Sequence, residues 1–313
     1  MAAMLLRKFS YACLSLLLLV SLTFVLMKTL PGDPFNQEQA LPKEIYEGLR
    51  SHYGLNDSLP VQFGRYLSQL VTFDFGPSLV YKGRSVRQII ATAFPTSAIL
   101  GAEALLIAIP LGLFAGIFAG MHRNRWQDAI IIVAAVIGIS VPSFILATFL
   151  QYLFGIKMHL LPIARWGSFA HTILPALSLA ALPAAFIARM TRIKMIDEMH
   201  QGYITTARAK GLPEWRVILI HALKNILAPI LSYLGPLTAN ILTGSFIIEK
   251  IYGIPGLGYW FVSSVLNRDY PLIMGITIFY CALLLLAAFI VDVACIYLDP
   301  RLAQQSKSKE GSA

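Results

Sequence analysis

The sequence predicts an all-α membrane protein with six transmembrane helices, and three observations support this fold class. First, 57% of the 313 residues are hydrophobic and 13% are charged, with a mean hydropathy of +0.68. A soluble domain of this length is far less apolar. Second, six apolar stretches each have the roughly 20 residues needed to cross about 30 Å of hydrocarbon. Third, most basic residues lie in short segments beside these stretches.

The predicted spans follow one another along the chain, with one long connection after the first. The first span could be read as a signal peptide, because Arg7 and Lys8 precede a leucine-rich run. However, the apolar run from Phe9 to Met27 is longer than the usual signal-peptide core of about 7–15 residues, and no A-x-A cleavage site follows it. We therefore expect an uncleaved anchor. The predicted spans are residues 9–30, 97–120, 129–154, 171–190, 227–248 and 272–298.

Lys and Arg between the spans predict the orientation of the chain. The short segments on the side of the two termini hold 14 of these residues, whereas the two short connections on the other side hold 4. By the positive-inside rule, both termini face the cytoplasm. The connection at residues 31–96 is then an extracytoplasmic subdomain, which we expect to pack on the membrane face. We predict a single membrane domain over residues 1–313.

Several kinds of chemistry are absent from the sequence. The net charge of +9 would suit nucleic acid, but no basic stripe with interleaved aromatic residues occurs, so we predict no nucleic-acid partner. No G-x-x-x-x-G-K-[ST] phosphate loop occurs, so any ATP must be handled by another subunit. The six histidines lack metal-binding spacing, and Cys13, Cys281 and Cys295 all lie in apolar runs. We therefore expect neither a metal nor a cofactor in this chain.

Two acidic residues fall inside predicted spans, where an unpaired charge is costly. Glu103 lies near the outer end of the second span and would reach interfacial water or line a pathway. Asp292 lies near the cytoplasmic end of the sixth span and would cap or pair within the bundle. For both, a structural role is favoured over a functional one. A stand-alone secondary carrier would need a charge relay deeper in the membrane, and an intramembrane enzyme would need a catalytic set that the sequence does not offer.

Small residues and prolines recur in the spans, as in "IPLGLFAGIFAG" at 109–120 and "VPSF" at 141–144. Small residues let helices approach closely, and prolines interrupt the backbone hydrogen-bond ladder. This composition suits a translocation pathway, and it equally suits any packed bundle.

The basic segment at residues 191–226 interrupts the apolar sequence between the fourth and fifth spans. Within it we predict two short helices joined by a bend. The first covers 203–210 and ends at Gly211, which is placed as a left-handed cap. Pro213 suits the first turn of the second helix, and Glu214 lies near its positive end. Four apolar residues of the second helix are spaced to form one face leading to the next span: Trp215, Ile218, Leu219 and Ala222.

The surface of the first helix consists mostly of small residues. Thr205, Thr206, Ala207 and Ala209 would let it enter a cleft on a partner, with Arg208 and Lys210 providing charge at the rim. The alternative is a helix lying on anionic lipid. Because such helices carry bulkier apolar residues, the composition favours docking.

Motifs along the chain resemble one protein family. "TARAKG" (206–211), "HALKN" (221–225) and Pro229 are similar to the cytoplasmic signature of permease subunits of binding-protein-dependent ABC importers, in the oligopeptide, dipeptide and nickel branch. The similarity is strongest to the first of the two permeases, which has a long outer loop. Further matches are "PGDP" (31–34), "YGLNDSLPVQFGRYL" (53–67), "DFGPSL" (74–79), "ISVPSF" (139–144), "ARMTR" (188–192), "YGIPGLG" (252–258) and "LDPRL" (298–302).

The resemblance implies the partners and the role of the chain. It implies a multi-pass subunit of the bacterial plasma (inner) membrane that forms half of a peptide pathway with a second, homologous permease. Two ABC ATPase subunits would bind on the cytoplasmic side, and an extracytoplasmic peptide-binding protein would deliver substrate. The chain itself would not be an enzyme, and ATPase closure would reorient its spans. The same branch also imports nickel chelates and glutathione, so the substrate stays open.

The resemblance also implies the contact surface for the ATPases. The broader family has an E-A-A-x-x-x-G signature, and Gly211 aligns Thr205 with its glutamate, so that carboxylate is absent here. A basic contact from Arg208 and Lys210 to an acidic partner is expected instead. The expected coupling residues are Tyr203, Thr205, Thr206, Ala207, Arg208, Ala209, Lys210, Gly211, Leu212, Pro213, Glu214, Trp215 and Arg216.

Overall fold

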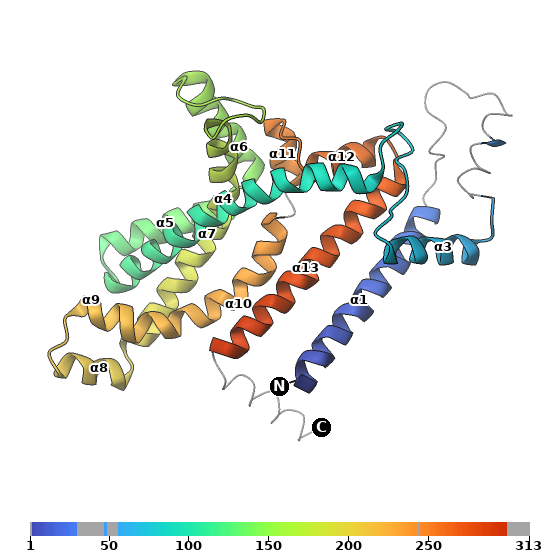
Figure 1. The fold of residues 1–313 in the computed structure, drawn as a ribbon. Helices are drawn as coiled ribbons and strands as arrows, with labels where there is room; N and C mark the ends of the chain where they lie inside the picture. The colour runs from blue at the N-terminus through green and yellow to red at the C-terminus, as the bar shows by residue number, and fades with distance from the viewer. Residues whose placement is uncertain (1, 30–46, 49–55, 243–244, 299–313) are drawn as a thin grey trace.

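The computed structural model describes residues 2–29, 47–48, 56–242 and 245–298, and these residues are almost entirely helical (Figure 1). One isolated antiparallel bridge joins Pro77 and Ser85. In chain order the helices are α1 (Ala2–Thr29), α3 (Leu59–Val71), α4 (Val86–Met121), α5 (Trp126–Ser140), α6 (Ser143–Leu150), the π-helix η1 (Gln151–Lys157), α7 (Ala170–Met199), α8 (Gly202–Ala209), α9 (Glu214–Arg216), the π-helix η2 (Val217–Ala222), α10 (Leu223–Leu242), α11 (Phe246–Tyr252), α12 (Leu257–Leu266) and α13 (Tyr270–Leu298).

Four of these helices are long and apolar enough to cross a membrane. They are the Phe9–Thr29 part of α1, α4, α7 and the Tyr270–Ile290 part of α13. Two bent helix pairs would each add one more span if the pair crosses as a unit, Trp126–Ser140 with Ser143–Lys157 and Glu214–Leu227 with Pro229–Leu242. By length and composition, four to six spans are therefore possible within the described residues.

The helices differ from the predicted spans mainly at their ends. A capping box formed by Ser85 and Gln88 starts α4 at Val86, so residues 86–96 belong to this helix although the sequence placed them in the outer subdomain. Helix α7 continues through Met199, which places the start of the predicted cytoplasmic segment inside a long helix. The predicted fifth span at 227–248 covers parts of two helices, α10, which ends at Leu242, and α11, which begins at Phe246.

The third predicted span is not a continuous helix. Helix α5 ends at Ser140, and the chain turns by 104° before Ser143–Lys157. Val141 and Pro142 form the break, and both have extended ψ values of 119° and 137°. Proline lacks an amide N–H and pushes the residue before it out of the helical region, which accounts for the bend.

Helices α4 and α7 form the centre of the bundle. Three glycines four residues apart on α4, namely Gly112, Gly116 and Gly120, face α7. A Cβ atom on Gly116 would lie 2.5 Å from both the Ala188 carbonyl oxygen and the Thr191 Cβ atom, so only glycine fits there. The expectation that small residues in "IPLGLFAGIFAG" permit close helix approach is confirmed for this pair.

The described part of the outer connection packs on the helices. Helix α3 contributes Tyr66 to a small buried cluster with Val20 and Phe24 of α1 and Ile278 of α13. Further along, Ser78 and Leu79 donate hydrogen bonds to the buried carboxylate of Asp269, which precedes α13. The "PGDP" motif lies outside the described residues.

Different helices lie at the two ends of the bundle in Figure 1. The start of α1, the end of α13 and helices α8 and α9 lie on one side, whereas α3, α11 and α12 lie on the other. This arrangement agrees with an even number of crossings between the ends of α1 and α13.

Candidate coupling segment

The predicted bend between the two short helices that follow α7 is present in the structure. Helix α8 ends at Ala209, and Gly211 takes the left-handed conformation with φ +75°. The amide of Gly211 donates to the Arg208 carbonyl, and that of Leu212 donates to the Ala207 carbonyl. This is the Schellman pattern of a glycine-terminated helix, and it confirms the predicted role of Gly211. Pro213 lies one position earlier than predicted, as the N-cap of α9.

One face of α8 is anchored in the protein core. Ile204 and Ala207 are buried in a cluster with Ile187 and Met195 of α7 and with Val217, Ala222, Ile226 and Ile230 of the helix that follows. Leu212, which follows the bend, packs against the same cluster. The hydrophobic cluster therefore fixes both the helix and the turn that ends it.

The opposite face of α8 is exposed and consists mostly of small and basic residues. The exposed positions of α8 and its two cap residues are Gln201, Gly202, Tyr203, Thr205, Thr206, Arg208, Ala209 and Lys210. The predicted small surface is thus present, apart from Ala207, which faces inward. A helix with this outer face can bring its backbone close to a partner.

An ion pair spans the bend. The guanidinium of Arg208 donates to both carboxylate oxygens of Glu214, at 2.5 and 3.2 Å. Both side chains are 43% exposed, so the pair contributes little to stability. Arg208 is therefore engaged within the chain, while Lys210 is exposed and forms no ion pair with a described residue.

A polar cluster of three residues, Glu198, Tyr203 and Asn225, ties α8 to its neighbours. The Tyr203 hydroxyl donates to the Glu198 carboxylate at the end of α7. The Asn225 amide, at the start of α10, donates to the Tyr203 oxygen at 2.8 Å and to Glu198 at 3.4 Å. Partial burial and then the hydrogen bond to Glu198 raise the pKa of Tyr203. We call these residues the Tyr203 clamp.

The buried face of the helix after the bend agrees only in part with the one predicted. Ala222 is fully buried and Ile218 packs against the same cluster, whereas Trp215 and Leu219 are 57% and 54% exposed. The i→i+5 hydrogen bonds of the π-helix η2 (Val217–Ala222) place residues five apart on one face, so the fully buried Val217 joins Ala222 there. The α-helical spacing assumed for this stretch was therefore wrong. Arg216 lies over the exposed Trp215 ring, 5.1 Å from its centroid.

A buried carboxylate organises the "YGIPGLG" stretch on the other side of the molecule. Glu249 is fully buried and accepts a 2.7 Å hydrogen bond from the Ser97 hydroxyl of α4 and one from the Tyr259 amide in the first turn of α12. A Cβ atom on Gly256 would collide with both Glu249 and Ser97. Glu249 was not predicted as a site residue, although a lone acid between isoleucines and a glycine-rich turn is a usable signal.

Glu103 and Asp292 are the two acidic residues that the sequence placed inside predicted spans. One carboxylate oxygen of Glu103 is buried without a hydrogen-bond partner among the described residues. The side chain of Asp292 lies outside the described set. Within the described residues, no three His, Cys, Asp or Glu side chains come together as a metal site.

The sequence matches two family descriptions that together cover most of the chain. Residues 108–304 match the family described as binding-protein-dependent transport system inner membrane component, and residues 1–100 match the N-terminal region described for the same transport systems. Among solved structures, an inward-facing form of the MetNI methionine ABC transporter aligns with a TM-score of 0.48 and 16% identity, over 68% of this chain and 97% of that one.

Characterised relatives match over nearly the whole length. The chain is 45% identical to the dipeptide transport system permease protein DppB of Bacillus subtilis (strain 168), over 98% of this chain and 100% of that one. It is 43% identical to the oligopeptide transport system permease protein OppB of Escherichia coli (strain K12), over 96% and 99%. The chain therefore belongs to the family of inner-membrane components of binding-protein-dependent transport systems.

Proposed function

We propose that this chain is a permease subunit of an ATP-driven peptide importer and that residues 203–216 receive the motion of the partner ATPases. Near-full-length relatives that are named for dipeptide and oligopeptide transport support the substrate class. ATP hydrolysis belongs to separate subunits in this proposal. A second, homologous permease completes the pathway, and an extracytoplasmic binding protein delivers the peptide.

The geometry of α8 is the observation that carries the coupling proposal. Its outer face is small, basic and exposed, while its inner face is locked to α7 and α10 by the hydrophobic cluster and the Tyr203 clamp. A load applied to the outer face is therefore transmitted to two long helices rather than absorbed by a loose loop. Six spans with both termini in the cytoplasm would place α8 on the ATPase side.

Arg208 and Lys210 are not equally available for the proposed contact with an acidic partner. Since Arg208 is paired with Glu214, Lys210 at the end of α8 and the exposed Arg216 after the bend are the cations of this segment that remain for an acidic partner. Arg208 would join only by exchanging Glu214 for a partner carboxylate, which costs little because the exposed pair is weak.

Gly211 provides the test of this docking surface. A Cβ atom on Gly211 meets nothing within 4 Å in the isolated chain, so a side chain can leave the backbone there without a clash, and a bulky one is expected to collide with a docked partner. Gly211→Trp should abolish co-purification of the ATPases and peptide uptake together. The left-handed backbone itself costs roughly 1–2 kcal/mol with a non-glycine residue, so a backbone control is required.

Gly253 is the matched control. It also ends a helix in the left-handed conformation, with φ +62° and open space around its Cβ position, but it lies on the α11 side. Gly253→Trp should retain the ATPases at the wild-type ratio. If Gly211→Trp also retains them and transports normally, residues 203–216 are not the coupling segment.

The substrate class is tested with the purified complex and its cognate binding protein. Competition among di- and oligopeptides, glutathione and nickel chelates for the binding protein should rank peptides first. ATP-independent uptake by this chain alone, driven by an ion gradient, would instead establish a secondary carrier.

A further inference from the structure

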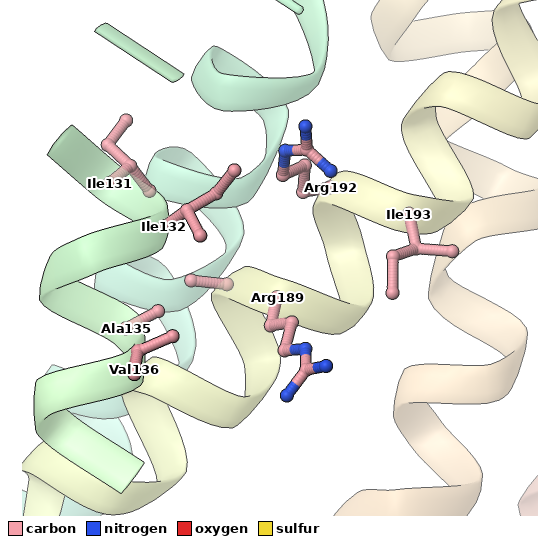
Figure 2. A pocket seen from close by; sticks show the side chains of 8 residues that line it. Ile131, Ile132, Ala135, Val136, Arg189, Arg192 and Ile193 are labelled. Atoms are coloured by element: carbon pink, nitrogen blue, oxygen red, sulfur yellow. The ribbon is translucent and has the colours of Figure 1, made fainter. Parts of the chain in front are cut away.

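The exposed face of α10 differs from the exposed faces of the other long apolar helices. Each of α1, α4, α5, α7 and α13 exposes large hydrophobic side chains, such as Leu106 of α4 and Ile130 of α5, which are 74% and 57% exposed. Figure 2 shows aliphatic side chains of α5 beside a groove between α5 and α7: Ile131, Ile132, Ala135 and Val136. The described residues of α10 include no exposed large hydrophobic side chain.

Polar residues and prolines occupy the exposed face of α10 instead. Five residues spaced three or four apart fall on one side of the helix: Asn225, Pro229, Ser232, Pro236 and Asn240. All are exposed except Pro229, which is partly exposed. We call these five residues the polar stripe. Since proline has no amide N–H, the two prolines each remove one backbone hydrogen bond from this helix.

The polar stripe extends along the proposed fifth span. Ser232 precedes the end of α10 at Leu242 by ten residues, which corresponds to roughly 15 Å of helix, or half of the about 30 Å of hydrocarbon in a bilayer. Asn240 lies close to the end of α10, and Asn225, near its start, belongs to the Tyr203 clamp. Ser232 is therefore placed at the middle of the membrane.

Aromatic side chains lie beside the polar stripe. α10 contacts both α7 and α13 (Figure 1). Tyr233, which follows Ser232, stacks on the 40% exposed Phe186 of α7 with ring centroids 4.2 Å apart. The Tyr280 hydroxyl of α13 donates to the Asn240 side-chain oxygen at 2.8 Å. Hydroxyl, amide and aromatic groups thus occur together on this part of the surface.

The chemistry of the polar stripe suits a peptide in transit better than lipid or another helix. Hydrocarbon offers no partner to polar side chains or to the carbonyls that a proline leaves without an N–H. A helix of another subunit uses most of its own N–H groups internally. Water and an extended peptide can donate to such carbonyls, and hydroxyl and amide side chains can bind a peptide backbone whatever its sequence.

We propose that Ser232 and Asn240 line the path of the transported peptide, where their side chains exchange hydrogen bonds with its backbone. This assignment rests on the proposed function in peptide import. It makes α10 both the helix that contacts the substrate and the helix that Asn225 connects to the coupling segment.

The first test measures access of water in the whole transporter. The complex of this chain with its second permease and ATPases is placed in lipid nanodiscs, with the three native cysteines of this chain changed to serine. Ser232→Cys and Asn240→Cys should react with a charged, water-soluble thiol reagent, as read from the mass of this chain. Leu106→Cys, near the middle of α4, should stay unreactive. Val71→Cys, at an 81% exposed position of α3, should react and shows that the reagent is active.

The second test uses the sign of a charge and keeps the native cysteines. In vesicles with the cognate binding protein, Asn240→Asp should favour uptake of lysine-containing over glutamate-containing peptides about fivefold, and Asn240→Lys should shift this ratio in the opposite direction. An effect of this size is expected for two charges about 4 Å apart in water. The binding protein is the same throughout, so its own selectivity cancels when each ratio is divided by that of the wild type.

Three results would overturn the assignment. They are unreactive cysteines at both stripe positions while Val71→Cys reacts, selectivity that is the same in both charged variants, and loss of the second permease from both charged variants, which would place the polar stripe in a subunit interface. A wild-type complex that imports no peptide would contradict the proposed function instead. The labelling test needs no substrate, so the two failures are distinguishable.

Discussion

Glu249 illustrates at the scale of one residue how a buried carboxyl group can hold a connection in place. Burial raises the pKa of Glu249 to about 7, although the hydrogen bonds from Ser97 and from the Tyr259 and Gly258 amides favour the ionised form. The carboxyl group belongs to α11 and lies at the positive end of α12, where a helix N-terminus stabilises negative charge. It joins α4, α11 and α12 in one place.

The raised pKa predicts a pH-dependent stability. Because the folded chain holds the Glu249 proton to a higher pH than the reference pKa of 4.5, the resulting stabilisation is complete below about 4.5 and is lost as the pH rises through about 7. The shift corresponds to roughly 3 kcal/mol. Thermal unfolding of the purified complex should therefore occur at a higher temperature at pH 5 than at pH 8.

Glu249→Gln should remove this pH-dependent component, because the amide does not titrate. The exposed Glu47 is the control residue, and Glu47→Gln should melt like the wild type at both values of pH. An equal pH dependence in the wild type and in Glu249→Gln would show that other groups dominate.

The contact between α4 and α7 leads to a prediction at the scale of elements. Ala at an ordinary helical position is more stable than Gly by about 1 kcal/mol. At Gly116 the added methyl group would overlap the α7 backbone, and overpacking of this kind costs about 1–3 kcal/mol. Gly116→Ala should therefore lower the melting temperature.

Gly64 is the matched glycine, since it lies within α3 and its Cβ position is open. Gly64→Ala should raise the melting temperature slightly or leave it unchanged. A similar rise for Gly116→Ala would show that the two helices are less closely packed than the structure indicates.

The elements also show what a sequence can and cannot predict. Composition and length predicted the apolar helices, and local stereochemistry predicted the turn at Gly211 because few other residues adopt a positive φ easily. The bend at Pro142 and the π-helical turn η2 were missed, since both depend on how a helix meets its neighbours. Of the face predicted for this stretch, Ala222 is buried, whereas Trp215 and Leu219 are exposed.

In the candidate coupling segment, too, local features were predictable from the sequence and long-range contacts were not. Its small outer surface follows from "TARAKG", whereas the Tyr203 clamp joins residues up to 27 positions apart and has no local signature. Asn225 was singled out only as part of "HALKN", and its contact with Tyr203 required the three-dimensional fold. Long-range hydrogen bonds of this kind are set by helix packing rather than by spacing.

At the scale of the whole molecule, α7 and α10 connect the two sides of the bundle. Figure 1 shows α8 at one end of this pair and α11 and α12 at the other. The Glu249 site fixes α11 and α12 to α4, and α4 in turn packs along α7 through its glycines. Motion of α8 would therefore reach the far side through helices in direct contact, provided that the clamp holds.

The Tyr203 clamp gives a prediction that separates binding from coupling. Tyr203→Phe removes the hydroxyl that contacts both Glu198 and Asn225 and leaves the hydrophobic anchor of Ile204 in place. We expect the ATPases to remain bound and to hydrolyse ATP, while the number of peptides imported per ATP falls several-fold.

Tyr152→Phe serves as the control for this prediction, because it removes a hydroxyl from an exposed tyrosine in η1. Asn225→Ala should reproduce the uncoupled phenotype, since it breaks the same cluster from the α10 side. Loss of the ATPases in Tyr203→Phe would instead assign Tyr203 to the docking surface. Unchanged stoichiometry in both clamp variants would mean that the hydrophobic cluster alone transmits the motion, and that α8 is rigid without its polar contacts.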